Sequence, residues 1–401
     1  MGNFTFKGML LATVFMLLGC LSIQAGDDGL ITKQITVTLD KAGTLPDKIG
    51  SAKKYKITNL KIIGEINGTD WLLIRDMAGG NSDGRSYETG GRLATLDLSE
   101  AKIVSGGEFY FSPWWTSDIA YTSKDVLGAY AFYQCTSLVS LTLPKSITEI
   151  GARAFQECSN LANVAIPASV TSIGMLAFWG CSGLTGITIP SSVTSIGSSA
   201  FYGCSGLTSL SFPSGITSIG SSAFYGCSGL TSLSFPSGIT SIGSSAFYGC
   251  SGLTSLSFPS GITSIGSSAF LGCSGLTSLS FPSGITSIGS SAFLGCSGLT
   301  SIYVYAEKMP KLGTNMFDDC DAKKCTVYVP KGTYDDYWLS EFGYFENIVE
   351  FDPTGINNVI TSNDAKELSR YSLNGQRLSA PTKGLNIVKY SDGSVKKVAV
   401  Q

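Results

Sequence analysis

Apolar residues return at a fixed spacing through the middle of this chain. From residue 138 onward they follow the pattern L-x-x-L-x-(L/I/F)-P-x-x-(I/V)-T-x-I-G-x-x-A-F-x-x-C. The 23 residues from 196 to 218 return letter for letter at 219–241 and again at 242–264. A fixed period of this size predicts a solenoid, in which each unit buries its apolar face against its neighbours.

One repeat shows how the residues divide between core and surface. In a strand, successive side chains point to opposite faces, so Leu210 and Phe212 should point inward while Ser209 and Ser211 face solvent. Pro213 lacks the donor for a further ladder bond and should end the strand. The repeats therefore predict a β-rich solenoid, a right-handed stack of roughly nine to ten coils about 4.8 Å apart.

The cysteines mark the repeat. Equivalent side chains of neighbouring coils should have Cβ atoms about 4.8 Å apart, whereas a disulfide requires about 3.8 Å. A straight row also cannot converge on a zinc ion. We therefore expect a buried row of free thiols at Cys135, Cys158, Cys181, Cys204, Cys227, Cys250, Cys273 and Cys296. A local disulfide between Cys320 and Cys325 stays open as an alternative at the end of the stack.

Composition excludes several classes of function. The net charge is −2, which gives no attraction to nucleic acid, and there is no histidine, the commonest general base and metal ligand. Between Cys158 and Ala306 there is no Asp, Glu, Lys or Arg, so a pair of catalytic carboxylates has no place there. The acidic turn at 318–321 offers too few oxygens to predict a calcium site. We therefore expect no enzyme activity, no metal and no cofactor.

Two surface rows remain as candidate binding residues. One is the row of outward serines at Ser209, Ser211, Ser232, Ser234, Ser255 and Ser257. The other follows the repeated phenylalanine and comprises Tyr133, Trp179, Tyr202, Tyr225 and Tyr248. Aromatic rings beside neutral hydroxyls suit uncharged protein or glycan surfaces. The alternative is that these rings only pack over the corners between coils.

The N-terminus predicts export. Lys7 is followed by an apolar stretch at 8–19 and then by polar residues, as in a signal peptide of residues 1–25. Cleavage after Ala25 would release a soluble protein, whereas the "LLGC" at 17–20 resembles a lipobox that would leave Cys20 lipidated. No other stretch is apolar and long enough to span a bilayer, so we expect a secreted or cell-surface protein on the outer side of the membrane.

The flanks divide the rest of the chain. We expect an N-terminal cap at 26–92, the repeat solenoid at 93–305, a C-terminal cap at 306–351 and a small β-module at 352–401. The module is predicted from alternating apolar and polar residues around Asn374-Gly375 and Asp392-Gly393, which favour hairpin turns. Caps are needed because the open ends of a solenoid expose unpaired strand edges.

The signature "IG..AF..C" with the LxxLxLP strand resembles the BspA-like bacterial leucine-rich repeats over about residues 93 to 350. The resemblance implies a surface protein without catalytic residues that binds host or bacterial surface proteins as an adhesin. Residues 352–401 are similar to a cell-surface sorting domain, although shorter. The expected function is therefore protein binding or adhesion to host, matrix or other cells, and the alternative is a surface glycan-binding protein that assists polysaccharide capture.

Overall fold

The computed structural model describes residues 29–85, 89–352, 367–372, 377–378, 380–381, 383–390 and 395–400. The predicted signal peptide, its cleavage site after Ala25 and the lipidation candidate Cys20 lie outside these residues. Among the residues described, no helix is long and apolar enough to cross a membrane.

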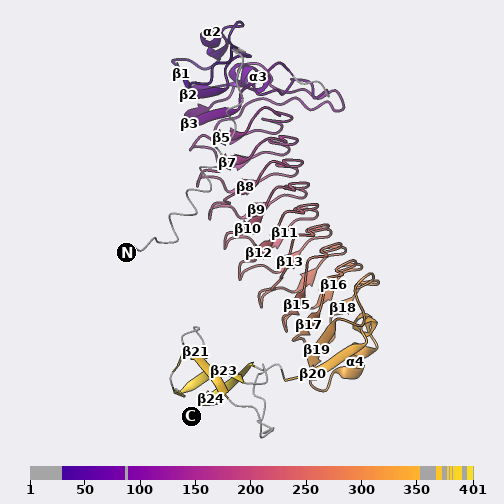
Figure 1. Cartoon of the computed structure of the whole chain (residues 1–401). Coiled ribbons are helices and arrows are strands. Elements are labelled where there is room, and N and C mark those ends of the chain that lie inside the picture. Colours follow the sequence, from indigo (N-terminus) through magenta and orange to yellow (C-terminus); the bar gives the residue numbers. More distant parts are fainter. Residues whose placement is uncertain are drawn as a thin grey trace.

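The predicted β-solenoid is confirmed: short parallel strands stack coil on coil along one axis (Figure 1). One face is built by β1 (Ile35–Leu39), β2 (Asn59–Ile66), β3 (Thr95–Ile103), β5 (Ser140–Thr142), β7 (Asn163–Ala165), β10 (Ser209–Ser211), β12 (Ser232–Ser234), β15 (Ser278–Phe281), β17 (Ser301–Val304), β19 (Thr326–Pro330) and β20 (Asn347–Phe351). A second series comprises β4 (Val126–Leu127), β6 (Glu149–Ile150), β8 (Ser172–Ile173), β9 (Ser195–Ile196), β11 (Ser218–Ile219), β13 (Ser241–Ile242), β14 (Ser264–Ile265), β16 (Ser287–Ile288) and β18 (Lys311–Leu312).

The stack has about 14 turns, more than the nine to ten expected from the repeats. The flanks account for the difference, because they continue the ladder without carrying the repeat signature. Ile35 pairs with Leu60, and the chain of parallel partners continues through β3 into β5. At the other end, β19 and β20 extend the ladder from β17.

The interior of each coil is filled by the residues that the repeat predicts. The repeated phenylalanines stack face to face along the axis, with centroids 4.8 to 5.4 Å apart from Phe132 to Phe293, and none is exposed. Burying a large apolar side chain contributes roughly 1.5 to 3 kcal/mol. Because the stacking partner lies in the next coil, this stabilisation depends on both neighbours being present.

The glycine of the "IG" pair is required by close approach of the backbones. A Cβ added at Gly243 would lie 2.7 Å from the backbone nitrogen of Ser221 in the preceding coil. That distance is too short for any real Cβ contact, so the glycine lets adjacent coils pack at the spacing of the sheet. The next corner uses left-handed backbone at Ser245 (φ 55°) and Gly249 (φ 69°).

Helices occur only at the two ends of the described stack. The N-terminal end carries α2 (Leu45–Ile49) and α3 (Gly68–Met77), and α3 begins with a capping box between Asn67 and Asp70. The C-terminal end carries α4 (Tyr334–Trp338) and the 3-10 helix η1 (Glu341–Tyr344). The Tyr337 hydroxyl donates to the Ala306 carbonyl (2.7 Å), which ties α4 to the last coils.

Helix α3 and the insertion at 106–121 supply the hydrogen-bond donors that are missing at the N-terminal end of the stacked loops. In the stack, alternate backbone N–H groups of one coil donate to carbonyls of the next, as Phe155 does to Ala177. The loop at residues 129–134 is the first in this series. No equivalent loop precedes it in the described part of the chain, so no backbone N–H there donates to the carbonyls of Ala129, Ala131 and Tyr133. Side chains of the cap donate to them instead: the Tyr110 hydroxyl to Ala129 O, the Trp71 indole to Ala131 O and the Arg75 guanidinium to Ala131 O and Tyr133 O.

The C-terminal strands form a separate antiparallel sheet in the order β22-β21-β23-β24. They are β21 (Glu367–Ser372), β22 (Arg377–Leu378), β23 (Gly384–Tyr390) and β24 (Val395–Val400). The two dipeptides expected to form hairpin turns lie outside the described residues. The sheet therefore has the character expected of a small β-module, and its similarity to a sorting domain is taken up below as a proposal.

Candidate binding surfaces

Four residues of the predicted aromatic row form a regular, half-buried line that we call the tyrosine row: Trp179, Tyr202, Tyr225 and Tyr248. The rings of Tyr202 and Tyr225 stack at 4.5 Å, and those of Tyr225 and Tyr248 at 4.4 Å, nearly parallel. Trp179 lies 6.0 Å from Tyr202 and is tilted by 43°. The coil spacing imposes this geometry, because each ring occupies the same place in consecutive repeats, of which the three with tyrosine are identical.

The stacking decides which part of each ring can meet a partner. The faces of Tyr225 are covered by its two neighbours, so its hydroxyl and ring edge are the parts that remain toward solvent. Burial first, and then the neighbouring hydroxyls of Tyr248 and Tyr202, raise the pKa of Tyr225 above its ordinary value of 10. Tyr225 therefore keeps its proton, and the row offers hydroxyls that can both donate and accept hydrogen bonds.

Tyr133 does not belong to this exposed row, and its prediction as a surface residue is wrong. It is only 6% exposed, because the insertion at 106–121 covers it: its ring packs 5.2 Å from Phe111 and 5.8 Å from Trp115. Gln156 occupies the equivalent place in the next coil, so the line is also interrupted before Trp179. The repeat pattern could not predict the burial of Tyr133, because the insertion that covers it does not follow the repeat.

The serine row lies on strand positions that face solvent. Ser209 pairs with Ser232 and Ser211 with Ser234 across β10 and β12, and all four are exposed, as are Ser255 and Ser257. Further along the stack, tyrosines take the place of the outward serines: Ser280 pairs with Tyr303, and Tyr303 pairs with Tyr328. With no histidine in the chain, these serines have no imidazole base that could activate them as nucleophiles.

The eight cysteines of the repeat are free and buried, one in each coil. From Cys158 onward each thiol donates to a phenylalanine carbonyl of the preceding coil; for example Cys204 donates to Phe178 O at 3.2 Å. Burial raises the pKa of Cys227 to about 12, so the thiols are protonated and unreactive at neutral pH. Cys320 and Cys325 are also free, so no local disulfide joins them.

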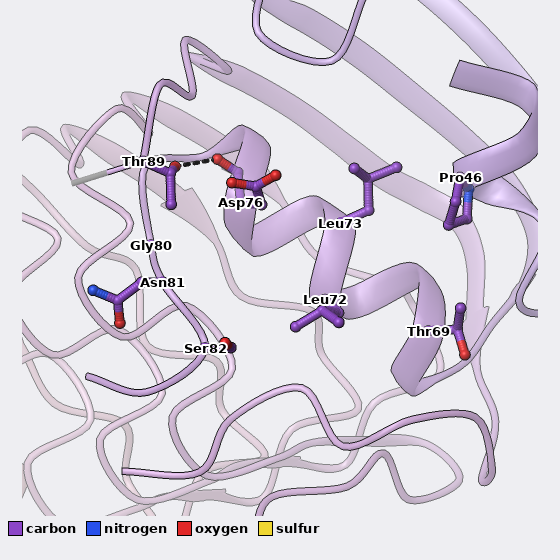
Figure 2. A pocket seen from close by; sticks show the side chains of 9 residues that line it. All are labelled: Pro46, Thr69, Leu72, Leu73, Asp76, Gly80, Asn81, Ser82 and Thr89. Atoms are coloured by element: carbon purple, nitrogen blue, oxygen red, sulfur yellow. Dashed lines mark hydrogen bonds between the residues drawn. The ribbon is translucent and has the colours of Figure 1, made fainter. Parts of the chain in front are cut away.

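The structure adds a cavity of about 470 Å³ over the outer face of α3, which the sequence did not indicate (Figure 2). Leu72 and Leu73 of α3 and Pro46 of α2 supply its apolar wall. Polar groups of the helix and of the segment that follows it complete the lining: Thr69, Asp76, Gly80, Asn81, Ser82 and Thr89. A cleft of this volume, mainly apolar with a few polar groups, is typical of small-ligand sites.

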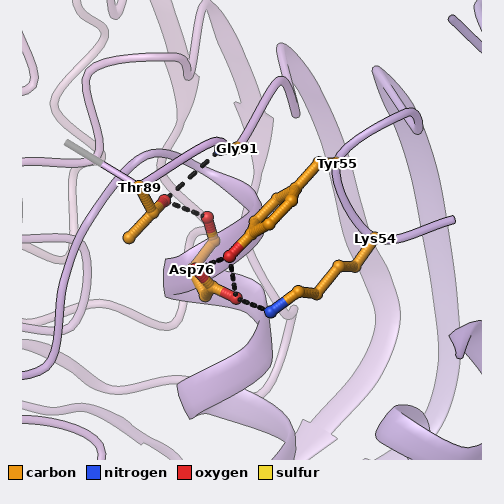
Figure 3. A network of polar contacts seen from close by, with 5 residues as sticks. All are labelled: Lys54, Tyr55, Asp76, Thr89 and Gly91. Carbon is orange, nitrogen blue, oxygen red and sulfur yellow. Dashed lines mark hydrogen bonds and ion pairs between the residues drawn. The ribbon is translucent and has the colours of Figure 1, made fainter. Parts of the chain in front are cut away.

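A polar network borders this cavity at Asp76 (Figure 3). The Asp76 carboxylate lies 2.7 Å from Lys54 Nζ and accepts a hydrogen bond from the Tyr55 hydroxyl at 3.0 Å. The hydrogen bond to Asp76 raises the pKa of Lys54. The Thr89 hydroxyl donates to the Asp76 carbonyl and accepts from the Gly91 N–H. The carboxylate is thus paired with a cation, and this wall carries no net charge.

The comparisons with known proteins agree with the solenoid. Residues 125–231 and 195–324 match the family model described as BspA type Leucine rich repeat region, in six copies. The repeat-bearing part of the chain is therefore a leucine-rich repeat solenoid, and its repeats are of the BspA type. Proteins built in this way are leucine-rich repeat proteins of the bacterial surface-protein type and are generally not enzymes.

The comparison with solved structures finds several leucine-rich repeat proteins of bacteria. A leucine-rich repeat protein from Bacteroides ovatus is 26% identical over 58% of this chain and 66% of its own, with a TM-score of 0.46. The T. pallidum leucine rich repeat protein is 28% identical over 45% and 76%, with a TM-score of 0.34. The pneumococcal vaccine antigen PcpA is 16% identical over 82% and 91%, with a TM-score of 0.40. This chain thus matches just under two thirds of the Bacteroides ovatus protein, and no curated protein matches it.

Proposed function

We propose that this chain is a non-enzymatic protein of the cell surface or of the secreted fraction, which binds proteins of host, matrix or other cells through its tyrosine row. The observation that carries the proposal is the row itself: four neighbouring aromatic rings, half-buried and stacked along the axis of the coils. Tyr and Trp are enriched at protein interfaces because each joins a large apolar area to a polar group.

The repeats themselves indicate that the tyrosine hydroxyls are not needed for folding. Leu271 and Leu294 take the same place in two further repeats that are otherwise nearly identical, and they too are half-buried. The corner therefore accepts an aliphatic side chain as readily as a ring. The hydroxyls and ring edges of Tyr202, Tyr225 and Tyr248 are then free to serve a partner.

The tyrosine row suits a protein better than a sugar. A sugar ring binds an aromatic side chain by lying flat on its face, and the faces in this row are occupied by the neighbouring rings 4.4 to 4.5 Å away. A protein partner can instead use the hydroxyls and edges as a line of hydrogen-bonding and apolar contacts. The glycan-binding alternative therefore needs a different part of the surface.

The proposed location depends on segments outside the solenoid. The leader expected at residues 1–25 would export the chain, and either cleavage after Ala25 or lipidation of Cys20 would leave the repeats outside the cell. The C-terminal sheet of β21 to β24 would then act as a sorting module. Detecting the mature N-terminus and any lipid by mass spectrometry of the native protein tests the leader and decides between the two ways of processing it.

The test of the binding site replaces Tyr202, Tyr225 and Tyr248 together by leucine, the residue that the chain itself uses at 271 and 294. Central aromatic contacts contribute about 2 kcal/mol or more each, so we expect binding to cells and to a panel of matrix proteins to weaken at least about tenfold. The thermal transition should stay unchanged. Raising the salt concentration should matter little, because the stretch between Cys158 and Ala306 has no charge to screen.

A matched variant replaces Ser209, Ser232 and Ser255 by alanine on the strand face and should bind as the natural protein does. Equal binding by the folded tyrosine variant and the natural chain would refute the proposed site. Loss of binding in the serine variant alone would move the site to the serine row.

A further inference from the structure

The N-terminal cap carries a second aromatic surface, separate from the tyrosine row. In the insertion at 106–121, Trp114 is 68% exposed, and Ile119 and Tyr121 are each more than half exposed. Clustered large apolar side chains on a surface mark interaction sites. We propose that this surface, together with the cavity over α3, is a binding site for a neutral oligosaccharide, with Trp114 as the stacking platform.

The insertion is held in place by backbone hydrogen bonds. Phe111 and Ala120 form an antiparallel bridge, so the segment folds back on itself. Ser112 N donates to Ser82 O at 2.8 Å, and Trp114 N donates to Asp83 O at 3.1 Å. In Figure 1 the loops beside α3 project further from the stack than those of the later coils. The platform is thus preorganised, which lowers the entropy cost of binding.

The two tryptophans of the insertion have different roles. Trp115 is a support: its ring lies over Gly84, where an added Cβ would come within 2.5 Å of it, and packs 5.8 Å from Tyr133. Trp114 stands perpendicular to Trp115, at 89° with centroids 5.9 Å apart. This arrangement, with the high exposure of Trp114, leaves a flat indole face open to solvent, unlike the covered faces of Tyr225.

An open indole face is chemically suited to a sugar. One face of a pyranose ring presents C–H groups that carry partial positive charge, and the face of an aromatic ring is negative. The two surfaces are flat and of similar size, so they can pack without either partner changing shape. The polar edge of the sugar stays hydrated or turns to hydrogen-bonding groups nearby.

Such hydrogen-bonding groups line the cavity over α3, and the segment that anchors Trp114 is part of that lining. Ser82, whose carbonyl is bonded by Ser112, also lines the cavity over α3, with Leu72 as an apolar wall and Thr69 at the far end (Figure 2). A volume of about 470 Å³ lies in the range of small-ligand pockets. Because Asp83, which holds Trp114, directly follows Ser82 of the cavity, we expect a sugar chain to lay one unit on Trp114 and to extend another into the cavity.

Charge decides between neutral and acidic sugars. The cations beside the site are paired, Lys54 with Asp76 at 2.7 Å and Arg85 with Asp83 at 3.4 Å. The insertion itself carries the exposed acids Glu108 and Asp118 and has no basic residue between positions 106 and 121. An acidic polysaccharide would meet like charge here, so the geometry favours an uncharged one.

The experiment is affinity electrophoresis of the full chain through gels that contain amylopectin, glucomannan or xylan, with polygalacturonate as the acidic probe. We expect at least one neutral polysaccharide to retard the protein and polygalacturonate not to do so. Calorimetry with the hexasaccharide of the retarding polymer should show that Trp114→Ala weakens binding at least about tenfold. Trp338→Ala is the matched control, because Trp338 is 45% exposed at the opposite end of the stack.

Two further variants separate the parts of the proposal. Leu72→Trp narrows the cavity without touching the platform, and it should also weaken binding of the hexasaccharide; unchanged binding would show that the cavity takes no part. The leucine variant at Tyr202, Tyr225 and Tyr248 should bind sugar normally, so failure of one site leaves the other testable. The proposal is overturned if no neutral polysaccharide retards the protein, if Trp114→Ala and Trp338→Ala behave alike, or if Trp114 proves necessary only for a protein partner.

Discussion

The middle coils and the N-terminal end of the stack differ in what donates hydrogen bonds to equivalent backbone carbonyls. In the middle, Phe201 N donates to Ala223 O, and each coil meets an almost identical neighbour, so no side-chain donor is needed. At the end, the carbonyls of Ala131 and Tyr133 face no coil, and the buried Arg75 donates to both. Where the repetition stops, side chains of the cap take over the carbonyls that backbone N–H groups of the neighbouring coil bind in the middle.

The middle coils should be sensitive to alkali. Burial raises the pKa of Cys227 to about 12 and that of Cys135 to about 11, from an ordinary value of 9.0, and raises the pKa of Cys204 well above it. In the unfolded chain these thiols would lose their protons near pH 9, whereas in the fold they keep them. Stability is therefore unaffected by the thiols below about pH 9 and should fall between about pH 9 and pH 12, by up to about 1.4 kcal/mol per thiol and pH unit.

Denaturant unfolding at a series of pH values, under reducing conditions, checks this prediction, which carries the largest effect because eight thiols act together. Replacing Cys204, Cys227 and Cys250 by alanine should make the decline with pH shallower, even if stability at pH 7 is lower. The thiols should also resist alkylation until the protein is denatured. A free energy of unfolding that stays constant from pH 9 to pH 11 would contradict the raised pKa values.

The N-terminal end should instead depend on single side chains. Arg75→Met keeps much of the volume but removes the guanidinium donor from four carbonyls, those of Tyr130, Ala131, Tyr133 and Asn81. The carbonyls of Tyr130 and Ala131 keep other donors, Tyr133 N and Trp71 Nε1. Because a hydrogen bond from a charged donor contributes about 1.5 to 3 kcal/mol, the free energy of unfolding should fall by about 3 kcal/mol. Among the residues that the structure describes, no Asp or Glu forms an ion pair with Arg75, and burial lowers its pKa, so the loss would reflect these carbonyls.

The matched control is Arg85→Met, because the Arg85 side chain is 65% exposed and should cost no more than about 0.5 kcal/mol. Guanidinium chloride unfolding measures both variants, and hydrogen exchange shows where protection is lost. Equal stability of the two variants would mean that the open carbonyls are satisfied in another way.

The same contrast separates what the sequence could predict from what it could not. The period of 23 residues determined the coil, the inward leucines and phenylalanines and the outward serines, because each repeat has the same environment as its neighbours. The period itself stops short of the ends of the ladder, since β1 and β2 share the ladder with the repeats but lack their signature. A parallel ladder depends on backbone geometry, and many sequences can supply it.

The candidate sites divide in the same way. The half-exposed places of Tyr202 and Tyr225 follow from their position in the repeat. The burial of Tyr133 and the cavity over α3 result from segments that are distant in sequence and have no periodicity, so only their contacts in space define them. The hydrogen bonds from the thiols to the phenylalanine carbonyls also escaped prediction, because the expected Cβ spacing excluded disulfides but did not show where each Sγ points.

The gentlest way to test the comparison is to remove one coil from the middle. Excising residues 219–241 joins Ser218 to Ile242, and because 196–218, 219–241 and 242–264 are identical, every residue at the junction finds the neighbour that it had before. Cys250 would then donate to the carbonyl of Phe201, as Cys227 does in the natural chain. The protein should fold, shortened by one coil.

The expected cost of that excision is modest. At about 0.05 to 0.15 kcal/mol per residue, removing 23 residues should lower the free energy of unfolding by about 1 to 3 kcal/mol, which is no more than the single Arg75→Met change. Circular dichroism and denaturant unfolding measure the loss. The same sample tests binding by the tyrosine row, which the excision shortens from four rings to three. If the excision unfolds the whole chain, the coils are not interchangeable, and stability cannot be a sum over neighbouring coils.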